Sequence, residues 1–340
     1  MGNSAILDLA GIKLSQMKVM CLGRYANTPM DPWTNLTFNQ MLVREQLGHA
    51  ASLESADIVL FCDYLEEDLR HINTLKVPIY KRVLLILEPE VVLPINFKNQ
   101  ILEEFGTVIR VGRPDKLQGY NLNWPQHWRE ISTELLNRNQ IDAVMVSGNK
   151  LSFVRGELYS LRRTAAMEIP NIALYGAEWN STFSVRLRKL LMEALNALKA
   201  GYFPRIRPMR YWFKNNRKWQ GAPGDKTKVL ENYRISLVIE NSTEFLTEKL
   251  FDSFFAACIP VYVGPNTENF GIPSSLVVNV TADISSIREG IRRAQAMDYP
   301  AWQAELEAWL AKEKTELDWS TESFFTQLRN LILGIASSNR

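Results

Sequence analysis

Short apolar runs alternate with helical patterns along most of the chain. The runs are four to six residues long, rich in Val, Ile and Leu, and contain few alternating polar positions. Such runs are typical of strands buried on both faces of a parallel sheet. They form two series. The first is Met17–Leu22, Ala56–Phe61, Arg82–Leu87 and Thr107–Val111, and the second is Ala143–Val146, Ile172–Tyr175, Ile235–Ile239, Ile259–Val263 and Leu276–Val280.

Helical patterns separate many of the predicted strands. Phe183–Lys199 places its apolar residues along one face and Arg186, Arg188 and Lys189 elsewhere. Thr247–Ala257 is predicted as a second helix. Because strands and helices alternate, the chain is predicted to be an α/β protein.

The two series of strands predict two Rossmann-like domains. A polar stretch with Pro and Asn, Arg113–Asn139, lies between the series and is interpreted as their junction. We therefore expect a first domain over residues 1–138 and a second over residues 139–319. The amphipathic helix Ser320–Leu333, within residues 320–340, either crosses back to the first domain or stays on the surface. Ligands of such sheets bind at the carboxyl ends of the strands, so a cleft between two facing domains is the expected site.

Composition narrows the classes of function. The chain has 340 residues, a net charge of +2 and three widely spaced cysteines. This charge gives no reason to expect a nucleic-acid partner, and the cysteines are interpreted as buried free thiols. The N-terminus has no secretory signal pattern and no run is long enough to span a membrane. We expect a cytoplasmic protein, with contact to the inner face of a membrane left open.

The chemistry concentrates between Tyr233 and Gly264. Glu240 ends an apolar strand, and Thr247 is a suitable N-cap for a helix that has Lys249 in its first turn. A helix N-terminus favours anions, so a lysine there indicates a bound polyanion such as a diphosphate. Taken singly, Glu240 and Lys249 are better explained as solvated charges, with Lys249 paired to Asp252. The whole segment favours a binding site.

This segment closely resembles the donor-binding signature of the α1,3/4-fucosyltransferase family, glycosyltransferase family 10. The family reads roughly Tyr-Lys-Phe-x-x-x-Phe-Glu-Asn-Ser, then Tyr-x-Thr-Glu-Lys, then Pro-Val-Tyr-x-Gly. This chain has Tyr233-Arg-Ile-Ser-Leu-Val-Ile-Glu-Asn-Ser242, Phe245-Leu-Thr-Glu-Lys249 and Pro260-Val-Tyr-Val-Gly264. The resemblance implies a GT-B fold, GDP-fucose as donor, a glycan acceptor and inversion of the anomeric centre. The acceptor would be an oligosaccharide or polysaccharide, for example of a cell surface.

The resemblance also implies roles for individual residues. Lys249 would contact the diphosphate, and Glu240 and Glu248 would orient hydroxyl groups of the ribose and the sugar. The remaining residues carried over with the motif are Asn241 and Ser242 in the loop, Phe245, whose ring would stack on a ligand, Thr247 and Gly264. A looser match places Arg217 at the phosphates, where a guanidinium suits phosphate oxygens.

Inversion requires a general base. In the family it is a carboxylate that follows a strand of the first domain. Glu88 takes this position after the strand Arg82–Leu87, and Glu90 is the reserve. Ser147, Asn149 and Tyr175 end two strands of the second domain and would lie at the edge of the cleft.

No motif in the sequence predicts a metal. There is no Asp-x-Asp pair, and the three histidines lack ligand spacing. We therefore expect neither a cofactor nor an obligatory metal, with a nucleotide sugar as the donor substrate. Three alternatives stay open: another nucleotide sugar as donor, a catalytically silent nucleotide- or carbohydrate-binding module, and an RNA-binding protein that uses the basic, aromatic stretch Arg205–Trp219.

Overall fold

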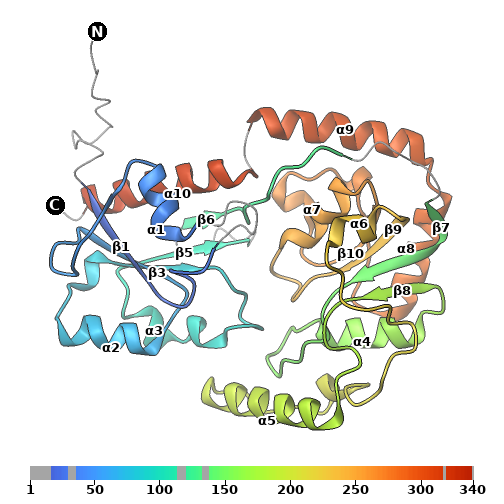
Figure 1. Ribbon diagram of the computed structural model, residues 1–340, viewed down its shortest axis with the longest axis horizontal. Helices are drawn as coiled ribbons and strands as arrows, with labels where there is room; N and C mark the ends of the chain where they lie inside the picture. Colours follow the sequence, from blue (N-terminus) through green and yellow to red (C-terminus); the bar gives the residue numbers. More distant parts are fainter. Residues whose placement is uncertain (1–16, 30–35, 113–119, 132–137, 317–318, 339–340) are drawn as a thin grey trace. The chain divides into compact units, whose positions relative to one another are not determined.

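A computed structural model describes residues 17–29, 36–112, 120–131, 138–316 and 319–338, and shows two compact units (Figure 1). One unit is Met1–His127 with Leu317–Arg340, and the other is Trp128–Glu316. The sequence analysis had given residues 128–138 to the first domain. Trp128 and Arg138 contact the second unit: Trp128 packs on Phe255, with ring centroids 5.5 Å apart, and Arg138 donates a hydrogen bond to the Ala256 carbonyl at 2.7 Å.

The first unit contains a six-stranded parallel sheet in the order β2-β1-β3-β4-β5-β6. Its strands are β1 (Lys18–Leu22), β2 (Gly48–His49), β3 (Ile58–Cys62), β4 (Arg82–Ile86), β5 (Thr107–Val111) and β6 (Tyr120–Leu122). Strand β6 lies inside the stretch that was interpreted as a junction. Three residues are too few to produce a readable pattern, but Leu122 is buried in the core.

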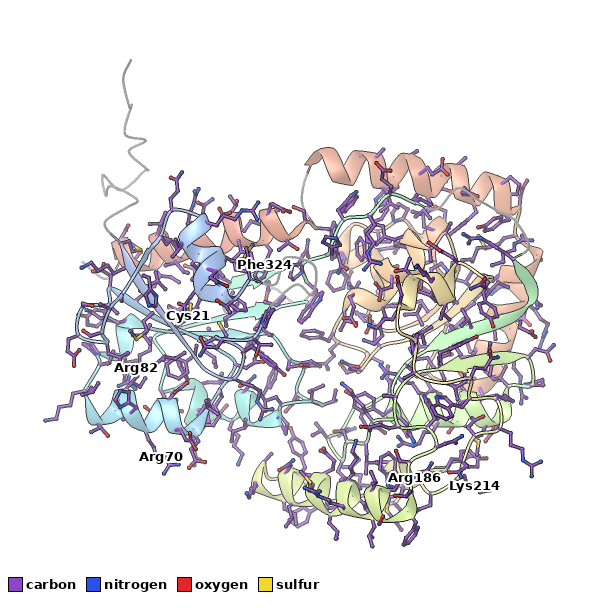
Figure 2. The ribbon with its side chains drawn as sticks, in the orientation of Figure 1. Cys21, Arg70, Arg82, Arg186, Lys214 and Phe324 are labelled. Carbon is purple, nitrogen blue, oxygen red and sulfur yellow. The ribbon has the colours of Figure 1, made fainter. Side chains whose placement is uncertain are left out.

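Alternate residues of these strands pack into two cores, one on each face of the sheet. Val83 and Leu85 belong to one core, and Leu84 and Ile86 to the other. The helices of this unit are α1 (Phe38–Arg44), α2 (Glu66–Thr74), α3 (Asn99–Leu102) and α10 (Thr321–Ser338). Helices α1 and α10 cover the face that Cys21 shares with Phe324, both labelled in Figure 2. The C-terminal helix thus completes the core of the first unit.

The second unit contains a five-stranded parallel sheet in the order β11-β10-β9-β7-β8. Its strands are β7 (Asn139–Val146), β8 (Ile172–Tyr175), β9 (Tyr233–Ile239), β10 (Ile259–Val263) and β11 (Val278–Asn279). Its helices are α4 (Tyr159–Glu168), α5 (Phe183–Lys199), α6 (Lys226–Leu230), α7 (Glu248–Phe255), α8 (Ile284–Ala296) and α9 (Tyr299–Glu316). The two parallel sheets confirm the predicted class of two Rossmann-like α/β domains.

In each sheet, successive strands of the chain are added first on one side of the initial strand and then on the other, so the strand order reverses at one point. It lies between β1 and β3 in the first unit, and between β7 and β9 in the second. The connections leave opposite sides of the sheet there, which opens a crevice at the carboxyl ends of the strands. Glu240 follows β9 directly at such a point. Among the described residues no helix is long and apolar enough to cross a membrane.

Candidate functional site

The centre of the candidate site is the turn between β9 and α7. Glu240 continues β9 and donates its backbone N–H to the Val263 carbonyl at 2.8 Å, so the neighbouring strand fixes its position. Its side chain is completely buried. One carboxylate oxygen accepts a hydrogen bond from the Thr247 N–H at 3.0 Å, and the other accepts one from the Thr247 hydroxyl at 2.8 Å. Glu240 therefore closes the loop that leads into α7.

Lys249 completes a chain of polar contacts with the same two residues. Its ammonium group donates to the Thr247 Oγ1 at 2.6 Å and lies 3.3 Å from a Glu240 oxygen. Helix α7 starts at Glu248 as predicted, but the Thr247 side chain bonds Glu240 instead of capping the helix. Lys249 therefore has a counter-charge within the protein, the buried Glu240 carboxylate, so its place in the first turn of α7 does not by itself require a bound polyanion. Glu240 is likewise occupied by protein donors rather than open to ligand hydroxyls.

Glu248 is the more accessible of the two motif carboxylates. Its side chain is 39% exposed, and it lies 3.8 Å from Lys249 and 3.7 Å from Lys226. Partial burial disfavours its charge, but the two lysines outweigh this and lower its pKa to about 2. Asp252 is 3.9 Å from Lys226, and burial followed by repulsion from Glu248 raises its pKa to about 6. A ligand hydroxyl that reaches this turn meets Glu248 as an ionised acceptor.

A buried arginine holds the loop at the β7/β9 reversal point. Arg162 of α4 donates to the Ile239 carbonyl and to Asn241 Oδ1, both at 2.9 Å. The Asn241 carbonyl in turn accepts the Leu158 N–H at 2.9 Å, and Ser242 forms an antiparallel bridge with Glu157. Asn241 and Ser242 are buried, and these contacts fix the loop in which they lie.

Two motif residues serve packing. Phe245 is only 1% exposed, so its ring belongs to the core and is not available to stack on a ligand, contrary to the expectation. Gly264 lies under the ring of Tyr262. A Cβ at Gly264 would be 2.3 Å from the Tyr262 hydroxyl, which explains why this position requires glycine. Burial, and after it the charge of Glu240, raises the pKa of Tyr262.

The other predicted residues of the second unit lie after β7, at the end of β8 and in the loop before α6. Ser147 and Asn149 are buried after β7, and Asn149 is tied to the next loop by its N–H, which donates to the Ala177 carbonyl at 2.9 Å. Tyr175 donates to Gln220 at 2.6 Å, which joins the end of β8 to the loop before α6. Arg217 lies exposed in that loop.

In the first unit, Glu88 is half-buried after β4 and accepts a hydrogen bond from the Tyr25 hydroxyl at 3.0 Å. Asp63, at the end of β3, is completely buried and has a left-handed backbone with φ 58°. Its Oδ1 accepts from the Leu87 N–H at 2.8 Å and from Asn96 Nδ2 at 2.7 Å. Burial, and after it the charge of Glu88, raises the pKa of Asp63 to about 7. Glu90 is half-buried in the turn that follows.

The sequence analysis missed four residues of these two sites. Asp63 directly follows a buried strand, the same signal that identified Glu88. Tyr25 and Lys226 reach their carboxylate partners from other segments of the chain, and no local pattern marks either. Arg162 stands in a helix whose residues from Tyr159 to Ala166 are all buried, but Ser160, Arg163 and Thr164 around it are polar, so no local pattern marks it.

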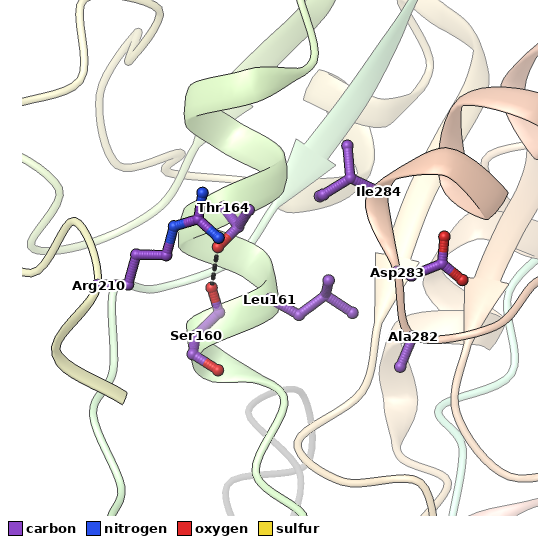
Figure 3. A pocket seen from close by; sticks show the side chains of 7 residues that line it. All are labelled: Ser160, Leu161, Thr164, Arg210, Ala282, Asp283 and Ile284. Carbon is purple, nitrogen blue, oxygen red and sulfur yellow. Dashed lines mark hydrogen bonds between the residues drawn. The ribbon is translucent and has the colours of Figure 1, made fainter. Parts of the chain in front are cut away.

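A separate cavity of about 220 Å³ lies beside α4 (Figure 3). Ser160, Leu161 and Thr164 line it from α4. Ala282, Asp283 and Ile284 line it from the start of α8, and Arg210 lies on the other side. The Asp283 side chain caps α8 by accepting the Ser286 N–H, and Arg210 pairs with Glu168 at 2.6 Å. Both charged groups are therefore engaged by the protein.

Comparison with known sequences gives one match of limited length. No family model matches the chain. A stretch of 59 residues is 41% identical to a fucosyltransferase-like protein of Arabidopsis thaliana, and covers 16% of this chain and 12% of that protein. The chain therefore matches about an eighth of the length of this curated relative.

Solved structures with similar folds include several glycosyltransferases. An α1,3-fucosyltransferase has a TM-score of 0.49 and 11% identity, over 95% of this chain and 90% of its own. HepE of Anabaena, solved with UDP, has a TM-score of 0.49 and 10% identity, over 94% of this chain and 100% of its own. Sucrose-phosphate synthase of Thermosynechococcus elongatus has a TM-score of 0.48 and 12% identity, over 94% and 74%. At these values the similarity does not decide an activity.

The role of Glu240 in closing the loop can be tested by stability. Glu240→Ala leaves the Thr247 N–H without its acceptor and Lys249, 19% exposed, without its buried counter-charge. We expect a loss of about 3–5 kcal/mol in the free energy of unfolding, measured by urea denaturation. Glu248→Ala is the matched control and should cost less than about 1 kcal/mol, because that side chain is partly exposed. Equal losses in the two variants would show that Glu240 has no special structural role.

The raised pKa of Asp63 predicts a pH dependence of stability. Between its unfolded pKa of about 3.9 and its folded pKa of about 7, the folded state retains a proton that the unfolded state releases. The contribution of Asp63 to stability is therefore full below pH 4 and lost as the pH rises through 7. Asp63→Asn keeps the Oδ1 acceptor and should remove this loss, on the order of 3 kcal/mol between pH 5 and pH 8.

Urea unfolding of the wild type and of Asp63→Asn at both pH values measures this difference. Glu67→Gln, on the exposed side of α2, is the control and should follow the wild-type profile. If Asp63→Asn follows it as well, Asp63 does not hold a proton near neutral pH in the folded state.

Proposed function

We propose that this protein is a glycosyltransferase of the GT-B type that transfers fucose from GDP-fucose to a hydroxyl group of a glycan. The observation that carries the proposal is the turn after β9. There the motif residues Glu240, Thr247 and Lys249 form one hydrogen-bonded chain at the point between β7 and β9 where the strand order reverses. Parallel sheets bind ligands at this kind of position. Two parallel α/β units are also the domain type from which GT-B enzymes are built.

In the proposed complex the donor lies over the start of α7. Lys249 and Lys226 provide positive charge for the diphosphate, and the backbone N–H groups at the start of the helix add to it. Glu248, the exposed carboxylate, accepts hydrogen bonds from donor hydroxyl groups. Glu240 holds Thr247 and Lys249 in place rather than contacting the donor. Arg217 is exposed in the preceding loop and supplies a further cation for the phosphates.

The proposed reaction needs a base on the acceptor side. Glu88 takes the proton of the acceptor hydroxyl, and the oxygen attacks the anomeric carbon. The bond from that carbon to the phosphate oxygen breaks, and GDP leaves with the electron pair, so the anomeric centre is inverted. The hydrogen bond from Tyr25 holds the Glu88 carboxylate in one orientation. No cofactor or resident metal is assigned to this reaction.

Two substitutions separate donor binding from chemistry. Lys249→Ala should weaken GDP binding about 10- to 100-fold in calorimetry, since a charge-assisted hydrogen bond contributes about 1.5–3 kcal/mol. Lys228→Ala, an exposed lysine on α6, is the matched control and should bind GDP like the wild type. Glu88→Gln should leave GDP affinity unchanged and lower turnover of GDP-fucose about 10²–10⁴-fold.

The outcomes against the proposal are distinct. Unchanged GDP affinity in Lys249→Ala would show that the diphosphate does not bind at the start of α7. Unchanged turnover in Glu88→Gln would remove Glu88 as the base. A thermal shift with UDP but not with GDP would show that the donor is a UDP sugar. If neither hydrolysis of GDP-fucose nor transfer to any acceptor is detected, a binding module is favoured.

A further inference from the structure

Helix α5 is arranged with a charged residue inside and leucines outside. Arg186 is buried, and its guanidinium donates to the carbonyls of Trp179 and Trp212 at 2.6 and 3.0 Å and to Asn215 Oδ1 at 2.8 Å. The other buried residue of the helix is Ala197. Helix α5 is held to its unit by these contacts of Arg186, which Figure 2 labels, and by Leu190 and Ala194, which pack against a small buried cluster around Trp212.

The larger part of the apolar face predicted for this helix points to solvent. The exposed apolar residues of α5 are Phe183, Val185, Leu187, Leu191, Met192, Leu195 and Leu198. The leucines at 187, 191, 195 and 198 recur every three or four positions, so they form one stripe along the helix. A stripe of this length exposed on a protein surface marks an interaction site.

The stripe continues beyond the end of the helix. Phe203 is 82% exposed and Ile206 is 86% exposed in the segment after α5. Exposed cations accompany these apolar side chains: Arg188 and Lys199 on the helix, and Arg205 between Phe203 and Ile206. The acidic residue of the helix, Glu193, is half-buried, and burial raises its pKa. The exposed surface of this segment therefore combines large apolar groups with positive charge.

We propose that α5 and residues 199–206 form a docking surface for an anionic lipid bilayer. The leucine stripe, Phe203 and Ile206 would enter the boundary between headgroups and acyl chains, with the helix parallel to the membrane plane. Arg188, Lys199 and Arg205 would contact lipid phosphates. The mixture of charge and apolar surface selects this partner, because an anionic interface offers a complementary component for each. The inference is independent of the proposed transfer reaction.

Vesicle sedimentation with the full chain tests the proposal without any activity measurement. The protein should sediment with vesicles that contain phosphatidylglycerol and much less with vesicles of pure phosphatidylcholine. Leu191→Glu with Leu195→Glu should lower the partition coefficient at least about ten-fold, since each leucine loses its burial in lipid. Arg188→Glu with Arg205→Glu should remove the preference for the anionic vesicles. The control Val43→Glu changes an exposed apolar residue of α1 and should leave binding unchanged.

Three results would overturn the proposal. The first is equal binding of the wild type and the leucine variant, and the second is equal binding to anionic and neutral vesicles. The third concerns hydrogen exchange measured without lipid. If the amides of α5 are protected in the wild type and lose this protection in the leucine variant, protein already covers the stripe. Circular dichroism of each variant checks that the fold is retained, which is expected because the substituted side chains are exposed.

Discussion

The candidate donor site depends on one buried carboxylate. Glu240 lies at the end of a strand, removed from water, and is stable there only because Thr247 and Lys249 supply donors to both of its oxygens. The same contacts define the loop from Asn241 to Leu246 and the direction in which α7 begins. Arg162 secures the other side of this loop. The position of Lys249 and the exposure of Glu248 both follow from this closed turn.

The first unit also has a buried carboxylate at the end of a strand, but there the carboxyl group keeps its proton. Asp63 is buried at the end of β3 and accepts its hydrogen bonds on one oxygen, while no partner is found among the described residues for Oδ2. Glu88 lies close enough for its charge to affect Asp63 and is held by Tyr25. In the second unit lysines neutralise the carboxylates, so Glu248 stays ionised. In the first unit burial, and after it the charge of Glu88, raises the pKa of Asp63 to about 7, so this carboxyl keeps its proton to near neutral pH.

Helix α5 shows that an amphipathic pattern does not say which medium covers the apolar face. Its pattern was read correctly and its bounds, Phe183–Lys199, agree with the structure. The expectation for a globular protein is that the leucines pack on the core. The side of α5 that packs on its unit instead uses Arg186 and Ala197, with Leu190 the leucine that packs against the buried cluster. The leucine face is thus left for a partner outside the unit, and the cations around it favour an anionic interface.

The sequence by itself determined the longer strands, the α/β class and the segment that carries the chemistry. Buried parallel strands are continuous apolar runs, and the motif from Tyr233 to Gly264 is local, so neither depends on distant residues. Tertiary structure alone decided that Glu240 is a structural carboxylate, that Phe245 is core, and that Lys226, Tyr25 and Asp63 join the sites. It also placed β6 and α10 in the first unit, where their partners lie far away in sequence. The physical reason is that burial and charge pairing depend on what surrounds a residue in space, which a single sequence records only where the neighbours are local.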